Sequence, residues 1–204
     1  MEKQIIKALE QLRQEEPRKF DQSVDLIINL QKFDIKRESI NLFVTLPHKI
    51  KNRKVCGFLT KKTGAIDVIT KPEFERYKDK KDIKKLIKSY DFFISHASLM
   101  PAVATTFGKY LGPAGKMPSP QLGIITLEDE NTIKALVEKI SHIVKLKSKE
   151  PSIKICIGKL SMKDEDIAQN IIPVYNAILN AVTKEKIKSV MIKLTMTKPI
   201  KITI

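Results

Sequence analysis

Short apolar segments that alternate with helical patterns fill the middle of the chain, and this alternation constrains the fold more than any other feature. Segments at 55–59, 65–69 and 91–95 are short and rich in β-branched, aliphatic or aromatic residues, which is typical of buried strands. The helical patterns lie at 81–89, 99–110 and 131–140. Strands that alternate with helices favour a parallel sheet between two helical layers, so we predict a three-layer, Rossmann-like α/β domain.

The two ends of the chain carry a different pattern. Before the middle region lie a helix at 5–12, which Pro17 is expected to end, and strands at 23–30 and 41–46. After it lie a strand at 152–160, a helix at 164–182 and strands at 189–196 and 199–204. Because each end alone is too short for a sheet with its own core, we expect the two ends to pair with each other.

Two polar segments, at 49–54 and 148–151, separate these parts and are candidate hinges. We therefore predict an α/β protein of two domains. The first is a split α+β domain built from 1–52 and 149–204, and the second is the inserted α/β domain at 53–148. A strand expected at 142–147 belongs to the inserted domain under this division.

The charge of the chain favours a polyanionic partner. Lysine and arginine total 38 against 23 acidic residues, which gives a formal net charge of +15. Nucleic acid is the preferred partner over an acidic membrane surface, because the chain has no tryptophan for a membrane interface. The longest charge-free run, at 92–108, is also too short to span a bilayer. A basic surface that serves only solubility is the third interpretation.

Basic and hydroxyl side chains mix near the C-terminus and again before the first strand. Six lysines fall between 184 and 201 against one acidic residue, Glu185, and they are Lys184, Lys186, Lys188, Lys193, Lys198 and Lys201. Hydroxyls at Ser189, Thr195 and Thr197 could reach phosphate or ribose oxygens. The second patch consists of Arg18 and Lys19, then Phe20, and then Gln22 and Ser23. Phe20 is either a stacking side chain or a core aromatic.

Motifs for catalysis are weak. The stretch YLGPAGKMPSPQLG at 110–123 contains a Gly-Lys pair, but Tyr110 and Met117 stand where a phosphate loop needs glycine and a hydroxyl. We expect a rigid loop there, with Lys116 available for RNA or another partner. The alternative hypothesis is an enzyme that acts on a phosphorylated substrate in the α/β domain and binds a nucleotide at 112–116.

Metal and disulfide chemistry is also disfavoured. The three histidines lack the spacing of a metal motif, and Cys56 and Cys156 are too few for a zinc site or a disulfide framework. We predict no catalytic residue, no metal and no cofactor. Two cysteines without a framework fit a reducing, cytoplasmic compartment.

Three segments resemble the L-one family of ribosomal proteins, which bind RNA in the mobile stalk of the large subunit, and the resemblance leans to the archaeal form. They are RKFDQSVDLIINL at 18–30, LPH at 46–48 and DFFISHASLMPAVATTFGKYLGPAGKMPSP at 91–120. The third is the strongest match, because the family carries LMP and then a GPRGKMPxP-like loop at this spacing. The resemblance covers almost the whole chain and implies a first domain, formed by both ends, that holds the main RNA site.

Carried over residue by residue, the resemblance implies RNA-binding roles for Lys19, Phe20, Ser23, Ser189, Thr195 and Met196. The sequence departs from the family next to these residues. Thr197 and Lys198 follow Thr195 and Met196, where the family has Gly-Pro. Glycine permits a close approach of the backbone that threonine resists, and Lys198 would add a phosphate contact in compensation. A second departure is Ala114, where the family loop often has arginine.

The resemblance also implies the function. We expect a structural constituent of the large ribosomal subunit that binds stalk ribosomal RNA near the site where deacylated tRNA leaves. It would be a monomer outside the ribosome. Its own messenger RNA, as the target of translational repression, and exit-site tRNA are further implied partners.

Overall fold

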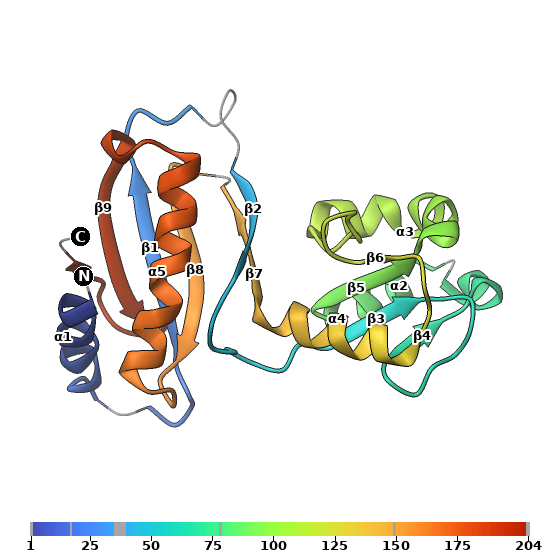
Figure 1. Cartoon of the computed structure of the whole chain (residues 1–204), viewed down its shortest axis with the longest axis horizontal. Helices are drawn as coiled ribbons and strands as arrows, with labels where there is room; N and C mark the ends of the chain where they lie inside the picture. The colour runs from blue at the N-terminus through green and yellow to red at the C-terminus, as the bar shows by residue number, and fades with distance from the viewer. Residues whose placement is uncertain (1, 17, 35–39, 78, 149, 203–204) are drawn as a thin grey trace. The chain divides into compact units, whose positions relative to one another are not determined.

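The computed structural model in Figure 1 describes residues 2–16, 18–34, 40–77, 79–148 and 150–202. The chain divides into two compact units. Unit 1 comprises Met1–Ile50 and His142–Ile204, and unit 2 comprises Lys51–Ser141. The mixed α/β class predicted from the sequence is confirmed.

Unit 1 is built on a four-stranded antiparallel sheet with the strand order β10-β9-β1-β8. Its strands are β1 (Ser23–Leu30), β8 (Ser152–Lys159), β9 (Ile187–Leu194) and β10 (Ile200–Ile202). Helices α1 (Glu2–Arg13) and α5 (Asp164–Ala181) pack on one face, and α5 lies in front of the sheet in Figure 1. The short helix η3 (Lys184–Lys186) precedes β9. Pro17 and the last two residues of the predicted strand at 199–204 lie outside the described residues.

Alternation of side chains fixes which face of this sheet is buried. Along β1, every second residue from Val24 to Leu30 is buried, because successive side chains of a strand point to opposite faces. The helix α5 supplies the facing layer with Ile167, Ile171, Val174 and Ile178, which recur at helical spacing. The opposite face of the sheet keeps its side chains half-buried or exposed.

A two-stranded antiparallel ribbon completes unit 1. It joins β2 (Asn41–Thr45) to β7 (Ile143–Lys147), with Val44 opposite Val144. Both valines and Leu146 are buried in the core of unit 1. The structure therefore differs from the expected domain boundary at 148/149: β7 belongs to unit 1, because its apolar face packs there, and the second division falls at 141/142.

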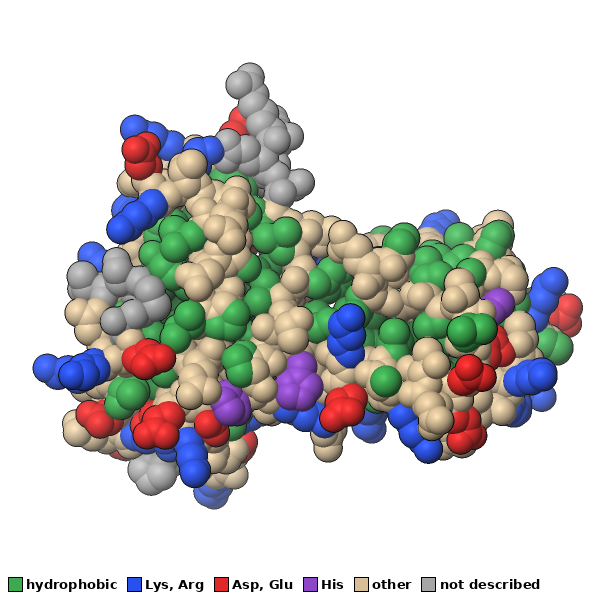
Figure 2. All heavy atoms as spheres, viewed as in Figure 1, with side chains coloured by type: hydrophobic (Ala, Val, Ile, Leu, Met, Phe, Trp, Pro, Cys, Tyr) green, Lys and Arg blue, Asp and Glu red, His purple; other side chains and the backbone are tan. Residues whose placement is uncertain are grey.

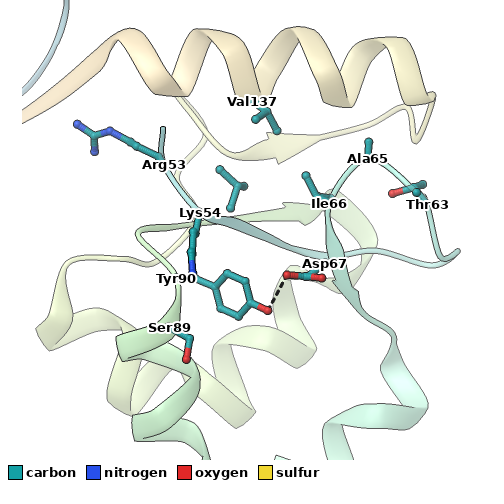
Figure 3. A pocket seen from close by; sticks show the side chains of 11 residues that line it. Arg53, Lys54, Thr63, Ala65, Ile66, Asp67, Ser89, Tyr90 and Val137 are labelled. Atoms are coloured by element: carbon teal, nitrogen blue, oxygen red, sulfur yellow. Dashed lines mark hydrogen bonds between the residues drawn. The ribbon is translucent and has the colours of Figure 1, made fainter. Parts of the chain in front are cut away.

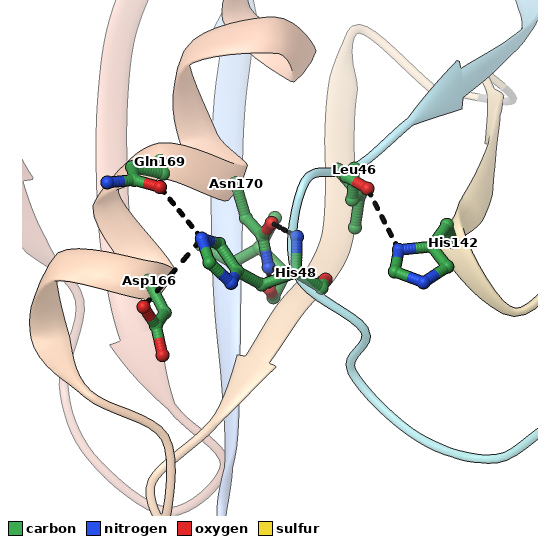
Figure 4. A network of polar contacts seen from close by, with 7 residues as sticks. Leu46, His48, His142, Asp166, Gln169 and Asn170 are labelled. Carbon is green, nitrogen blue, oxygen red and sulfur yellow. Dashed lines mark hydrogen bonds and ion pairs between the residues drawn. The ribbon is translucent and has the colours of Figure 1, made fainter.

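Hydrogen bonds hold the chain at the end of this ribbon where Thr45 pairs with Ile143 (Figure 4). The side chain of Asn170, which is completely buried in α5, donates from Nδ2 to the carbonyl of His48 and accepts from the His48 N–H. The His48 ring donates from Nε2 to Gln169 Oε1 at 2.7 Å. The Leu46 N–H donates to the His142 carbonyl at 2.7 Å. The two points where the chain leaves and re-enters unit 1 are thus fastened inside unit 1.

Unit 2 is built on a four-stranded parallel sheet with the order β4-β3-β5-β6. Its strands are β3 (Val55–Phe58), β4 (Asp67–Ile69), β5 (Phe92–His96) and β6 (Ile124–Ile125). Its helices are η1 (Lys71–Tyr77), α2 (Lys80–Ser89), η2 (Ala97–Leu99), α3 (Met100–Ala114) and α4 (Glu130–His142). The predicted strands and helices are present, and β6 is an additional strand that the sequence did not indicate.

The two faces of the unit 2 sheet are covered by different helices. Phe58, Phe74, Phe93 and Phe107 form an aromatic cluster on the side of α2 and α3, with ring centroids of neighbouring pairs 5.1–5.7 Å apart. Val55 points the other way from β3, and it lines a pocket with Val137 of α4 (see below). The sheet is therefore the middle of three layers, as the alternation of strands and helices predicts.

Candidate nucleic-acid interface

The side of the unit 1 sheet away from α1 and α5 presents polar side chains, and we call it the open face. On β1 its residues are Ser23, Asp25, Ile27 and Asn29, all half-buried. Neighbouring strands add Ser152, Lys154 and Cys156 from β8, Ser189, Met191 and Lys193 from β9, and Lys201 from β10. The face with α1 and α5, seen in Figure 2, instead shows acidic and basic side chains interspersed over α1 and the lower end of α5.

One row of the open face consists of an amide between two hydroxyls. Asn29 lies opposite Ser152 on one side and Ser189 on the other. Its Nδ2 donates to Ser189 Oγ at 3.0 Å, and Ser152 Oγ donates to its Oδ1 at 2.9 Å. Ser189 keeps its own O–H for another acceptor, which makes it suited to a phosphate or ribose oxygen.

The next rows combine apolar side chains with lysines and one carboxylate. Ile27 lies opposite Met191, and Met191 lies opposite Lys201. Asp25 lies opposite Lys193. Burial raises the pKa of Asp25, and the nearby Lys193 ammonium offsets only part of this effect.

A turn between β9 and β10 is fastened to the start of β1. The Ser23 N–H donates to Thr195 Oγ1 at 3.1 Å, and the Met196 N–H donates to Gln22 Oε1 at 3.2 Å. Within the turn, the Leu194 N–H donates to Thr197 Oγ1 at 3.0 Å. Thr195 Oγ1 also donates to the Ser23 carbonyl at 3.4 Å. Four side-chain bonds therefore fix the residues that display Met196.

Two large apolar side chains are exposed at this end of unit 1. Phe20 is 51% exposed and Met196 is 62% exposed. The interpretation of Phe20 as a core aromatic is therefore wrong. Asp21 anchors the adjacent backbone, because its carboxylate accepts from the N–H and the hydroxyl of Ser161. Exposed apolar side chains on an anchored backbone suit stacking on a base or a sugar.

The structure brings together some of the residues predicted for RNA binding. Ser23, Thr195 and Met196 meet at the turn, and Lys19 and Lys198 are exposed on the segments that flank these residues. Ser189 lies six residues before Thr195 on an extended strand, about 20 Å away. It therefore belongs to the row of Asn29 and not to the turn.

Sequence reasoning missed Asn29 and Ser152, and it placed Gln22 in the second patch without its role in the turn. Gln22 is only 2% exposed, and its position in QS before an alternating strand gave no sign that it bonds a turn more than 170 residues later. Asn29 has a detectable signal, because it is a polar residue at an outward position of an otherwise apolar strand.

The departure at Thr197 has a local explanation. Its hydroxyl closes the turn by accepting from the Leu194 N–H, a bond that glycine could not make. Within the described chain, Lys32 is the one non-glycine residue with a positive φ, so Thr197 does not need the conformational freedom of glycine.

The glycine-proline stretch at 110–123 differs from the expected loop. Helix α3 continues through Pro113 to Ala114, and Gly115, with φ of 70°, ends it in the left-handed conformation. Lys116 Nζ donates to the carbonyls of Ile87 at 2.6 Å and Tyr90 at 2.7 Å. The expectation that Lys116 is available for a partner is therefore wrong, because it caps the C-terminal end of α2.

Two further features bear on the predicted chemistry. Across the described ranges, no group of three or more His, Cys, Asp or Glu side chains is arranged to hold a metal ion. No helix in the part of the chain that the structure describes is long and apolar enough to cross a membrane.

Comparison with known proteins gives one consistent result. The model of the Ribosomal protein L1p/L10e family matches residues 12–198. The chain is 35% identical over 209 residues to large ribosomal subunit protein uL1 of Pyrobaculum neutrophilum, covering 97% of this chain and 91% of that protein. It is 36% identical over 211 residues to the uL1 protein of Methanobrevibacter smithii, covering 96% and 97%. For the uL1 protein of Pyrococcus abyssi, the identity is 34% over 213 residues, covering 97% and 94%.

Proposed function

Because the chain belongs to the Ribosomal protein L1p/L10e family, we propose that unit 1 binds a folded element of large-subunit ribosomal RNA in the mobile stalk. As a member of this family, the chain is a structural, non-enzymatic constituent of the large subunit of the cytoplasmic ribosome. The alternative of an enzyme acting on a phosphorylated substrate is thereby set aside. The bonds of Lys116 to α2 also remove the lysine that this alternative required.

The observation that carries the proposal is the anchored turn with its two exposed apolar side chains. Met196 and Phe20 offer stacking surfaces, Thr195 and Ser23 offer polar contacts, and Lys19 and Lys198 stand beside them. A preformed surface of this kind reads RNA by shape and by stacking, with little reordering on binding. The row of Ser189, Asn29 and Ser152 extends the surface along the sheet by about 20 Å.

The test is the affinity for a stalk-type ribosomal RNA fragment compared with an unrelated hairpin over a range of salt concentrations. We expect Phe20→Ala to cost about 1–3 kcal/mol of binding free energy if it stacks on a base. We expect Thr195→Val to cost about 1 kcal/mol through the lost hydroxyl. Thr105→Val on the exposed side of α3 is the matched control and should change nothing. Equal, salt-sensitive affinity for both RNAs in every variant would show that the +15 charge acts only as a general attraction.

The finer roles follow from the same surface. A stalk-like structure in the protein's own messenger RNA would occupy the turn and the open face, so translational repression is part of the proposal. Its test is competition: the messenger fragment should displace the ribosomal fragment, and Phe20→Ala should weaken both. Exit-site tRNA is proposed as a partner near the bound stalk, to be tested by cross-linking in assembled ribosomes.

A further inference from the structure

Unit 2 contains a pocket of about 610 Å³ that the proposed function does not use (Figure 3). It lies at the amino ends of β3 and β4, between α4 and the loop that leads into β4. Its volume is in the range of small-molecule sites. The pocket is made entirely by residues of unit 2.

The apolar part of the pocket comes from three separate elements. Val55 belongs to β3, Ile66 to the loop before β4, and Val137 to α4. In Figure 3, Val137 reaches down from the helix and Ile66 stands beside it at the edge of the sheet. Aliphatic side chains from a strand, a loop and a helix suit a flat ring that would be withdrawn from water between them.

A buried hydroxyl in the pocket has no partner. Thr63 Oγ1 is inaccessible to water and makes no hydrogen bond to the described residues. In Figure 3 this oxygen lies on the side of Thr63 that is nearer Ile66. Buried polar atoms are nearly always satisfied, so an unpaired hydroxyl that lines a pocket indicates a ligand atom able to donate or accept.

A second polar group is held in position by its neighbour. Tyr90 donates its phenolic hydrogen to Asp67 Oδ2 at 2.8 Å. Burial raises the pKa of Tyr90 to about 12, and the hydrogen bond to Asp67 adds to the shift, so the phenol keeps this proton at neutral pH. The carboxylate has further lone pairs, which can accept from an amino or hydroxyl group of a ligand.

The charges that line the pocket select the ligand class. Arg53 and Lys54 are the two cationic residues that line the pocket, and Asp67 is the one carboxylate among the lining residues. The neighbouring Asp91 is paired with Lys51, with the Nζ and Oδ1 atoms 2.9 Å apart. The charge of Arg53 also acts on Asp91 and helps to lower its pKa. The lining residues carry a formal net charge of +1, which favours an anionic ligand over a cationic one.

We propose that this pocket binds a single nucleotide, with the base against Val55, Ile66 and Val137 and the phosphate toward Arg53 and Lys54. Thr63 and Asp67 pair with polar groups of the base or the sugar. The nucleotide is presented either by a single-stranded RNA or as a free nucleoside monophosphate, since both offer the same ring and phosphate. The site is independent of the RNA interface of unit 1 and involves no catalysis.

The test uses the full chain with methyl-labelled valine and isoleucine, so that NMR signals of Val55, Ile66 and Val137 report on the pocket. The probes are the four nucleoside monophosphates, inorganic phosphate, and short single-stranded oligoribonucleotides. We expect saturable shifts of these methyl signals with at least one monophosphate, and smaller shifts with inorganic phosphate. Tighter binding of an oligoribonucleotide would identify RNA as the source, and monophosphate binding without oligonucleotide binding would identify the free nucleotide.

Two variants test the assignment of the pocket. Thr63→Val keeps the shape of the side chain and should weaken nucleotide binding about fivefold through the lost hydrogen bond. Lys54→Gln should weaken it by a similar factor, whereas Lys109→Gln on α3 is the matched control and should have no effect. Absence of shifts, or equal shifts with phosphate and nucleotides, would overturn the proposal. Affinity for the stalk fragment should be the same in all three variants, so failure here is distinguishable from failure of the ribosomal proposal.

Discussion

At the scale of single residues, the candidate interface depends on side chains that do not touch a ligand. Gln22 is nearly completely buried, and its Oε1 accepts from the Met196 N–H. Replacing it with leucine leaves this N–H without a partner inside the protein. Gln22 therefore positions the turn that displays Met196.

We predict that Gln22→Leu lowers the free energy of unfolding by about 1–2 kcal/mol through the unpaired group. Affinity for stalk RNA should fall as well, because the turn loses one of its anchors. Urea unfolding and RNA titration measure the two effects. Gln121→Leu, on an exposed residue of unit 2, is the control. Unchanged RNA affinity in Gln22→Leu would show that the turn holds its shape without this bond.

Asp25 makes the stability of unit 1 depend on pH. Burial raises its pKa above the ordinary value of 3.8, so the folded state holds the proton more tightly than the unfolded state. The stability contributed by this group is complete below pH 3.8 and is lost as the pH rises through the raised pKa.

We predict that Asp25→Asn is more stable than the parent at pH 7, by less than about 1 kcal/mol because solvent screens this half-exposed group. The difference should shrink as the pH falls toward 3.8. Urea unfolding from pH 3 to pH 7 measures it, with Glu10→Gln on the exposed side of α1 as control. A difference that grows on acidification would contradict the assignment.

At the scale of elements, one asparagine joins α5 to the segment after β2. Asn170 bonds the N–H and the carbonyl of His48 and also the carbonyl of Ile157 in β8. Asn170→Ala removes the side-chain partner of three backbone groups, one buried and two part-buried, and each loss costs about 1–3 kcal/mol. We predict a loss of at least about 3 kcal/mol in the stability of unit 1 by thermal or urea unfolding.

The contrasting variant at this site is His48→Ala. It keeps all the backbone bonds to Asn170 and removes the contacts of the ring with Gln169 and Asp166. The expected loss is therefore about 1 kcal/mol or less. Equal losses in the two variants would mean that the backbone bonds are not what holds this segment.

Lys116 acts on the stability of α2 and not on a ligand. Its ammonium group donates hydrogen bonds to two backbone carbonyls at the C-terminal end of α2, which is the negative end of the helix dipole. We predict that Lys116→Met destabilises unit 2 by about 1–3 kcal/mol, as for hydrogen bonds made by a charged group. Lys109→Met is the control. RNA affinity should be unchanged, and a large loss of RNA affinity in Lys116→Met with normal stability would contradict this role.

The sequence predicted helices and strands well where a local pattern determines them. It predicted them poorly where contacts between distant parts of the chain determine them. The strand at 23–30 was predicted with the observed bounds, because its alternation is strict. The two-residue strand β6 has too few residues to show a period. The end of α3 was placed too early because Pro113 suggested a break, whereas the helix runs through it to Ala114. The site residue Asn29 and the bond of Gln22 to the turn were missed because the partners lie far away in the sequence.

At the scale of the whole molecule, the residues that the structure describes form two separate hydrophobic cores. One is formed by α1, α5 and the sheet of β1, and it includes residues from both chain ends, such as Leu26 and Ile171. The other is the aromatic cluster of unit 2 around Phe58 and Phe107. Because the cores share no residue, each unit has its own source of stability.

This separation predicts that unit 1 folds and binds RNA without unit 2. The ends to be joined are close together, because the Leu46 N–H bonds the His142 carbonyl at 2.7 Å. Replacing residues 51–141 with about four glycine and serine residues should therefore leave the ribbon of β2 and β7 intact. We expect cooperative unfolding and an affinity for the stalk fragment close to that of the full chain, since the turn and the open face belong to unit 1.

Circular dichroism during urea unfolding and RNA titration measure both properties of the shortened chain. The control is the same deletion with Thr195→Val, which should lose as much affinity as it does in the full chain. If the shortened chain folds but no longer prefers the stalk fragment, the specific RNA contacts must lie in unit 2, and the interface assigned to the turn is wrong. Retained preference together with the same loss for Thr195→Val would place recognition in the sheet and the turn that the two chain ends build together.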